Sequence, residues 1–288
     1  FKHSVDVATM SMIIAKNMKM SSQDVYNIGI AGLLHDMGKS KIPLEILNKP
    51  GKLTIATGQP AYEPWVMNDK PESGEGYEAA VAYAVADKLG FKKSDVVWTR
   101  TAFDTAIAPG AKDWDFNIQQ FGITDERKKA VDFSSSYYND SQSVVVKKDS
   151  KFANATKVSD LKDATVGVMV GTLAYDYAKA NIKDDIQTFN DDAALAQALD
   201  AGQIDALVTS TVECVYMVQS EQVKDAKVLG RLPDSEDKSG MGIVLPKDSK
   251  LTAAVTKAVD DLNADGTIKK LQDKWLAEYT TDLTELKK

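Results

Sequence analysis

His35 and Asp36 are adjacent residues whose side chains could bind a hydrolytic metal ion, because imidazole and carboxylate groups are both common metal ligands. They lie in the stretch AGLLHDMGKSKIP, and His3, one predicted helix earlier, could supply a third ligand. Such a set would support phosphodiester hydrolysis at a metal centre. The structural alternative is a histidine at the edge of a small core, since His35 falls on the same helical side as Val25 and Ile28.

The residues around this pair resemble the opening part of an HD-GYP phosphodiesterase domain. The resemblance covers about residues 1–54 and is carried by HSV at 3–5, LLHDMGK at 33–39 and IPLEILNKPGKLT at 42–54. A complete domain of that kind implies further histidine and aspartate ligands downstream, but no histidine follows His35. Since a hydrolytic metal needs several protein ligands and an open position, we expect no catalytic residue, no metal site and no cofactor.

Charge is unevenly distributed along the 288 residues. Residues 1–52 contain seven lysines against three aspartates and one glutamate, a net charge of +3, so the remainder carries −10 of the total of −7. The acidic total argues against a general nucleic-acid binder, which needs a basic surface. Both histidines lie in the first part and all four tryptophans beyond it. This division indicates two different origins.

Export and redox signals are sparse in this sequence. The longest apolar runs fall short of the ~18 residues that a membrane-spanning helix needs. The first residues lack the charged start, apolar block and cleavage site of a signal peptide. Cys214 is the single cysteine, so an internal disulfide is excluded and the redox compartment stays open.

The pattern of apolar residues changes near Leu53. Before it, helical spacing predicts two helices and a short third one, with Ser21 in a capping position. After it, strands and helices alternate, which is typical of an α/β fold with two lobes. The expected strands are 53–57, 96–101, 116–120, 165–170, 185–189 and 206–209, and the expected helices are 77–89, 174–180, 191–201, 251–263 and 267–279.

Six stretches in this second part resemble the amino-acid-binding proteins of ABC importers. They are LTIATG at 53–58, GYEAAVA at 76–82, ITDERKKAVDFS at 123–134, VGVMVGT at 166–172, GQIDA at 202–206 and ADGTIKKL at 264–271. The resemblance implies the two-lobed, type II periplasmic-binding-protein-like fold, with hinges near Val144–Lys148 and Ser239–Val244 and a ligand cleft between the lobes. We accordingly expect an N-terminal helical segment at 1–52, lobe 1 at 53–146 and 240–288, and lobe 2 at 147–239.

Arg127 is the residue best suited to bind a carboxylate. Thr124 followed by two acids predicts a helix start that would project Arg127 next to the end of a strand, where ligands of α/β proteins collect. A guanidinium offers two parallel donors that match a carboxylate, and the resemblance implies this role for it. The resemblance also places Thr172 at a second carboxylate contact and Tyr62 and Phe103 as aromatic walls. Core packing is the alternative for Phe103.

Ser210 departs from the pattern of the resembling family, which usually has an aspartate there to pair with the ligand's ammonium. A hydroxyl cannot neutralise a buried ammonium ion. Glu213 could replace the missing carboxylate if a helical turn aims it inward, and the alternative is an exposed glutamate. Gly122, where a hydroxyl-bearing residue is frequent, and Gln120 also belong to the expected ligand site.

These observations favour an extracytoplasmic solute-binding protein of an ABC importer that closes on an amino acid or a similar small carboxylate. Its expected partners are that small-molecule ligand and a permease, and the N-terminal helices could mediate self-association. The alternatives are a sensory or regulatory fusion in which the binding module controls the HD-type helices, and an enzyme evolved on the binding fold. The tetrapeptide GKLT at 51–54 fits both parts, and natural recombination, an engineered fusion and an assembly error explain it equally well.

Overall fold

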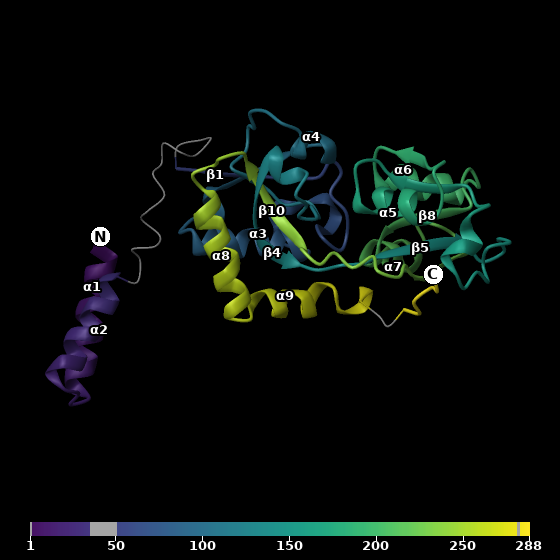
Figure 1. Cartoon of the computed structure of the whole chain (residues 1–288). Coiled ribbons are helices and arrows are strands. Elements are labelled where there is room, and N and C mark those ends of the chain that lie inside the picture. The colour runs from purple at the N-terminus through teal and green to yellow at the C-terminus, as the bar shows by residue number, and fades with distance from the viewer. Residues whose placement is uncertain (1, 35–50, 281–282) are drawn as a thin grey trace.

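Two lobes, each a sheet with helices packed on it, make up most of the molecule (Figure 1). The structure is a computed structural model and describes residues 2–34, 51–280 and 283–288. The strand order is β2-β1-β3-β10-β4 in the first sheet and β7-β6-β8-β5-β9 in the second. This arrangement confirms the α/β, two-lobed fold that the sequence predicts.

Parallel and antiparallel strands are mixed in the first lobe. Strand β1 runs parallel to β2 and β3, and β10 runs antiparallel to β3 and β4. The elements of this lobe are β1 (Leu53–Thr57), α3 (Tyr77–Lys88), β2 (Val96–Arg100), α4 (Phe103–Ile107), β3 (Phe116–Asn117), β4 (Val131–Tyr138), β10 (Met241–Pro246), α8 (Thr252–Ala264) and α9 (Thr267–Trp275). Every residue of β1 is buried, as the continuous apolar run predicts.

Helix α3 shows how the sequence builds this lobe. Tyr77, Val81 and Val85 recur every four residues, so they share one face of the helix and enter the core of the first lobe. Gly76 precedes the helix with a φ of 100°, and a Cβ there would lie 2.5 Å from the carbonyl oxygen of Trp65. A glycine is therefore required where the loop meets the helix.

The second lobe repeats this plan. Strand β6 runs parallel to β7 and β8, and β5 runs antiparallel to β8 and β9. Its elements are β5 (Gln142–Lys147), β6 (Val166–Met169), α5 (Leu173–Asn181), β7 (Gln187–Phe189), α6 (Asp192–Asp200), β8 (Ala206–Ser210), α7 (Thr211–Gln219) and β9 (Ala226–Arg231). Two clusters of buried apolar side chains lie on the two faces of β8, since alternate residues of a strand point to opposite sides.

The chain crosses between the lobes earlier than expected. The first sheet ends with Tyr138 and the second begins with Gln142, so the first crossing lies at 139–141, before the hinge that was expected at Val144–Lys148. Val144 and its neighbours are instead buried in β5, because their uninterrupted apolar run suits a central strand. The return crossing lies at 232–240, just before β10.

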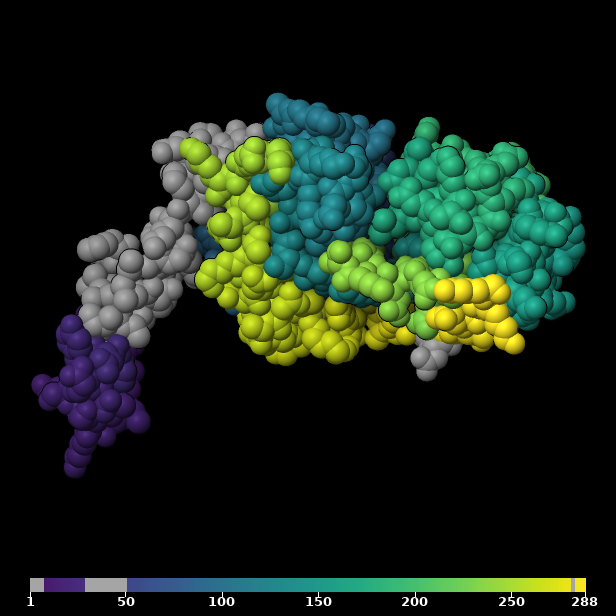
Figure 2. All heavy atoms as spheres, viewed as in Figure 1, coloured from purple at the N-terminus to yellow at the C-terminus, as the bar shows by residue number. Residues whose placement is uncertain are grey.

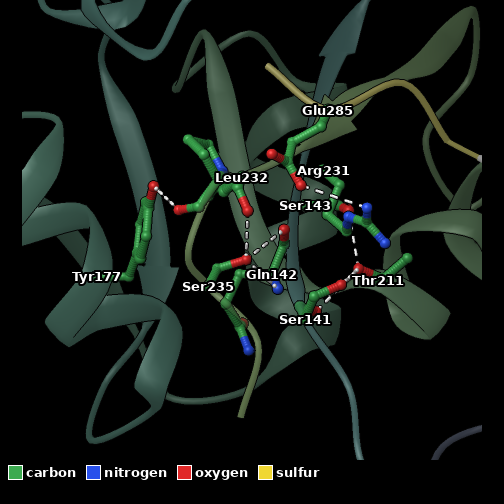
Figure 3. Close-up of polar contacts among 10 residues, drawn as sticks. Ser141, Gln142, Ser143, Tyr177, Thr211, Arg231, Leu232, Ser235 and Glu285 are labelled. Atoms are coloured by element: carbon green, nitrogen blue, oxygen red, sulfur yellow. Dashed lines mark hydrogen bonds and ion pairs between the residues drawn. The ribbon is translucent and has the colours of Figure 1, made fainter. Parts of the chain in front are cut away.

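Hydrogen bonds join the two crossings where they enter the second lobe (Figure 3). The backbone N–H of Gln142 donates to the hydroxyl of Ser235 at 3.0 Å, and the N–H of Leu232 donates to the carbonyl of Gln142 at 2.8 Å. On the other side of the strand, the hydroxyl of Ser141 lies 2.8 Å from that of Thr211. These contacts tie the start of β5 to its neighbours, so bending between the lobes is confined to short segments.

The last residues pack on the second lobe rather than on the first, where they were expected. The N–H of Arg231 donates to the carbonyl of Thr284 at 2.9 Å, and Glu285 forms an ion pair with Arg231 at 3.3 Å. The side chain of Leu286 is buried in the core of that lobe. Figure 2 shows this terminal segment in gold against the green second lobe, while α8 and α9 lie along the first. Apolar burial and strand-like pairing explain why it crosses over.

The N-terminal part forms two helices that pack on each other, α1 (Lys2–Asn17) and α2 (Ser22–Leu34) (Figure 1). Ser21 caps α2 as predicted, because its hydroxyl accepts the N–H of Asp24 at 3.2 Å. Ala8 and Ala15 are buried. The expected third helix and the pair His35 and Asp36 lie outside the described residues. None of the helices in the described part of the chain is long and apolar enough to span a membrane.

Deletion of residues 1–50 should leave the two lobes folded, because the side chains that form their cores come from Leu53 onward. The shortened protein is expected to show the same near-ultraviolet circular dichroism above 270 nm and the same cooperative thermal transition as the full chain, with its melting temperature within about 2 °C. A truncated protein that is unfolded or that melts much earlier would show that the helices and lobes form one unit.

Candidate functional site: a cleft between the lobes

A cleft between the two lobes brings together all the residues that the sequence singled out for a ligand. The eight predicted residues line it from both sides: Tyr62, Phe103, Gln120, Gly122, Arg127, Thr172, Ser210 and Glu213. They come from segments more than a hundred residues apart in the chain, which the fold places at one edge of each sheet. Their contact with a ligand stays a prediction, and their positions define the site.

Arg127 extends from the first lobe across the cleft to the second. It opens a single 3-10 turn, Arg127–Lys129. The hydroxyl of Thr124, three residues earlier, accepts the N–H of Arg127 at 3.1 Å. The expected helix is limited to this turn because β4 begins at Val131. The guanidinium donates to the carbonyl of Gly122 at 2.7 Å and to that of Gly171, in the second lobe, at 2.8 Å. Burial lowers the pKa of Arg127 from its usual value.

Phe103 lies against this arginine. Its ring stacks on that of Phe121 with centroids 4.6 Å apart, and the guanidinium carbon of Arg127 lies 5.5 Å from the Phe103 centroid. Phe103 thus packs against the core on one side, as the alternative predicted, and lines the cleft on the other. A planar cation over an aromatic face loses little conformational freedom when it binds a second partner.

Helix α5 begins directly opposite Arg127. The hydroxyl of Thr172 accepts the N–H of Tyr175 at 3.2 Å and donates to the carbonyl of Met169 at 2.8 Å, so it acts as the N-cap of the helix. Thr172, Leu173 and Ala174 all line the cleft. Since the first N–H groups of a helix have no partner within it, this end can accept an anion next to the guanidinium.

Gln120 is positioned by a carboxylate that sequence reasoning did not identify. Its backbone has a φ of 49°, and Glu78 accepts both its backbone N–H, at 2.7 Å, and its side-chain amide. The hydroxyl of Tyr137 also donates to Glu78. These bonds pull Gln120 out of the extended conformation, so the predicted strand 116–120 ends at Asn117. Burial raises the pKa of Glu78 to about 7.

Gly122 allows the lobes to approach closely. A Cβ on this residue would lie 2.5 Å from Cδ1 of Leu173 in the second lobe and 2.8 Å from Oδ2 of Asp237. The position where a hydroxyl-bearing residue was expected is thus one where even a methyl group would displace its neighbours.

Glu213 is buried and turned into the cleft, contrary to the alternative of an exposed glutamate. Ser210 ends β8 and caps α7 by accepting the N–H of Glu213 at 3.3 Å, so the chain becomes helical at once and aims Glu213 inward. Its Oε2 accepts the indole N–H of Trp65 at 3.2 Å, and Trp65 is fully buried.

Besides Glu213, three acids that the sequence did not bring forward line the cleft: Asp140, Asp192 and Asp237. Asp140 lies in the first crossing, and burial raises its pKa to about 6. Asp192 follows Asp191, the N-cap of α6, and its pKa is also raised by burial. In the sequence, an acid in a loop and an acid in the first turn of a helix resemble ordinary capping residues, so only their tertiary surroundings reveal them.

Direct hydrogen bonds close the cleft on one side. The hydroxyl of Tyr62 accepts the N–H of Ala193 at 3.3 Å, and the hydroxyl of Tyr216 donates to Glu63 at 3.1 Å. Each pair joins residues of different lobes. The two lobes are therefore in contact beside the cleft. Electrostatic interactions inside the cleft are stronger than in water, because the surrounding protein has a lower dielectric constant.

The buried acids should make the unliganded protein less stable as pH rises. The pKa values of Glu78, Asp140 and Glu213 are higher in the folded protein than in the unfolded chain. Their protonated forms therefore stabilise the fold fully at a pH below the unfolded-state pKa values, and this stabilisation is lost as the pH rises through the folded-state pKa values. We expect the unfolding free energy to fall by a few kcal/mol from about pH 5 to about pH 8.

Urea denaturation at intervals across this range measures the effect, and replacing Glu78 with glutamine should reduce the slope. A free energy of unfolding that is constant or increasing over the interval would show that these carboxyl groups are not buried as described.

Named relatives of the chain are amino-acid-binding proteins. An L-arginine-binding protein of Pseudomonas aeruginosa is 29% identical over 252 residues, which cover 82% of this chain and 91% of that protein. The L-cystine-binding protein TcyJ of Escherichia coli is 30% identical over 223 residues, which cover 76% of this chain and 81% of that protein.

Solved structures agree with these relatives. An ancestral arginine-binding protein bound to arginine superposes with a TM-score of 0.67 at 31% identity, and the match covers 78% of this chain and 98% of that one. The ancestral amino-acid-binding protein AncCDT-1, described as a precursor of cyclohexadienyl dehydratase, gives a TM-score of 0.67 at 30% identity, covering 81% and 99%.

Two family models match the sequence. The model of the HD domain matches residues 1–99, a range that includes β1, α3 and β2 of the first lobe as well as the N-terminal helices. The model of bacterial extracellular solute-binding proteins, family 3, matches residues 53–278, which span both lobes and the cleft. The chain belongs to family 3 of the bacterial extracellular solute-binding proteins.

Proposed function

We propose that this protein is the extracytoplasmic binding component of an ABC importer and closes its lobes on an amino acid. The observation that carries the proposal is the position of Arg127, which faces the start of α5 across the cleft and bonds to Gly171 there. The arginine- and cystine-binding relatives support an amino acid as the ligand. The closed form is the state that a permease would recognise.

The ligand's α-carboxylate binds between Arg127 and α5 in this proposal. A guanidinium has five N–H groups, and two of those of Arg127 bond to Gly122 and Gly171 within the described structure. The others are available to a carboxylate, and the first N–H groups of α5 supply the second half of the subsite. Because residues of both lobes contact the same group, the ligand itself holds the lobes together.

The side walls of the site act through shape and hydrogen bonding. Tyr62 and Phe103 present aromatic surfaces on the first-lobe side, while Gln120 and Gly122 form the loop beside Arg127. Tyr62 also bonds to the second lobe at Ala193. A ligand side chain between these residues would replace water at apolar and aromatic surface, which favours binding.

The N-terminal segment is, in our proposal, the start of an HD-GYP-type domain without a complete metal site. The chain contains two histidines, His3 and His35, and the family-like arrangement would require more. Met10 and Ile13 of α1 and Met18, just after it, are exposed, with 61%, 50% and 70% of each residue accessible. Such apolar surface favours self-association.

Replacement of Arg127 by alanine should abolish measurable amino-acid binding. Loss of a charge-assisted, two-pronged contact weakens binding by about 2–5 kcal/mol, roughly 30-fold to several thousand-fold. Lysine should restore binding in part, because it keeps the charge but not the planar fork. Isothermal titration with L-arginine, L-cystine and a panel of other amino acids measures these effects.

Lys128→Ala is the matched control for this change. Lys128 lies in the same turn, and its exposed side chain contacts Asp125, so its removal should leave affinity unchanged. Wild-type affinity in the Arg127→Ala protein would remove the proposed carboxylate site.

Purified protein should bind no stoichiometric iron or manganese and should not hydrolyse cyclic dinucleotides. The reason is the ligand count, since His3, His35 and Asp36 cannot complete a hydrolytic centre within one chain. Elemental analysis after dialysis against either metal, together with chromatography of the nucleotide, tests this expectation. One equivalent of bound metal with conversion of the nucleotide would establish the N-terminal part as an enzyme.

A further inference from the structure

Glu213 has an acceptor oxygen that the protein itself leaves unused. The residue is 3% exposed and lines the cleft, and its Oε2 accepts the indole N–H of Trp65 at 3.2 Å. Its Oε1 is buried and has no hydrogen-bond partner among the described residues. A buried carboxylate oxygen without a donor is costly, so the arrangement is complete only when a donor enters the cleft.

Other acids surround this carboxylate. The pKa of Glu213 is raised well above its usual value, first by burial and then by the charge of Asp192, with further contributions from Asp140 and Glu78. Asp140 and Asp192 line the same cleft, and Ser210 lies next to Asp140. Like charges held this close repel one another, and a cation among them would remove the repulsion.

The cleft as a whole has an excess of negative groups. Among the described residues that line it, Arg127 carries positive charge, whereas Asp140, Asp192, Glu213 and Asp237 carry carboxyl groups. Arg127 would bind the ligand's carboxylate, and it is also the cation that acts on Asp237. No other cation is left for Asp140, Asp192 and Glu213 among the cleft residues that the structure describes. An ordinary zwitterionic amino acid adds equal positive and negative charge and leaves that excess in place.

We propose that Glu213 and Asp140 form a cation-binding subsite that replaces the carboxylate missing at Ser210, and that the ligand is an amino acid with a net positive charge. This inference rests on the proposed function, because it places the cationic group of the same ligand whose carboxylate is proposed to bind Arg127. Ser210 keeps a separate role, since its hydroxyl caps α7 and thereby aims Glu213 into the cleft.

The cationic group is a nitrogen with several N–H donors, either the α-ammonium or a side-chain ammonium or guanidinium. Both would satisfy Oε1 of Glu213 and neutralise Asp140. Three probes distinguish the sources: L-arginine, L-citrulline, which has a neutral side chain of almost the same shape, and 5-guanidinopentanoate, which lacks the α-amino group.

Glu213→Gln tests the subsite with an isosteric change. Titration calorimetry should show that L-arginine binds at least about tenfold more weakly to this variant. Glu75→Gln, which removes the same charge from an exposed position, should bind as the wild type does. The unliganded Glu213→Gln protein should melt a few degrees higher, because one buried acid is neutralised. A residue with only a structural role would not change affinity and stability in opposite directions.

A charge relocation tests Asp140. Asp140→Ser should weaken L-arginine binding by at least about tenfold. The double variant Asp140→Ser with Ser210→Asp should restore it to within a few-fold, because a carboxylate at the end of β8 would lie next to the position of Asp140. Restored L-arginine binding would show that the ligand needs a carboxylate in this part of the cleft and does not need it at position 140.

The outcomes separate the two proposals. The inference requires that L-citrulline bind more weakly than L-arginine, because it assigns the ligand a net positive charge. 5-Guanidinopentanoate then identifies the nitrogen in the subsite: binding close to that of L-arginine assigns it to the guanidinium, and weaker binding assigns it to the α-ammonium. If wild-type protein binds L-glutamate or L-citrulline as tightly as L-arginine, or if Glu213→Gln and Asp140→Ser bind normally while Arg127→Ala does not, the inference is wrong and the proposed function stands. A folded wild-type protein that binds none of the panel overturns both.

Discussion

The guanidinium of Arg127 is the interaction on which the cleft depends. It is bonded at once to the first lobe through Gly122 and to the second through Gly171, and it supplies positive charge to a cleft otherwise lined by acids. The hydroxyl of Thr124 accepts the backbone N–H of Arg127, and the ring of Phe103 lies against the guanidinium. Because each of these supports lies in the first lobe, the arginine is preorganised before any ligand arrives.

The other side of the cleft is lined by buried acids that lower the stability of the unliganded protein. Glu213, Asp140 and Asp192 are held where burial and mutual repulsion raise their pKa values. Carboxyl groups in such surroundings destabilise the unliganded state and are retained where they bind something. Trp65 of the first lobe donates its indole N–H to Glu213 of the second, so this contact exists only when the lobes are together.

Motion between the lobes is limited to few connections. The crossings at 139–141 and 232–240 are joined near Gln142 and Ser235, and the terminal segment 283–288 adds a further link by packing Leu286 into the second lobe. Asp140 lies within the first crossing. A ligand contact at that residue would couple occupancy of the cleft directly to the backbone that bends, which is the coupling a binding protein needs.

The sequence by itself determined the α/β alternation, the buried strand Leu53–Thr57 and the cap at Ser21, because periodicity and capping are local properties. The resemblance to a known family added the residues expected in the cleft, and it left the direction of Glu213 open. It placed the hinge too late, since the apolar run at Val144 suits a central strand as well as a connector. Only the tertiary structure decided that Glu213 points inward, that Asp140 and Asp192 join it and that Gly122 contacts Leu173. These facts depend on groups from different lobes, and no spacing along the chain encodes which carboxylates become buried together.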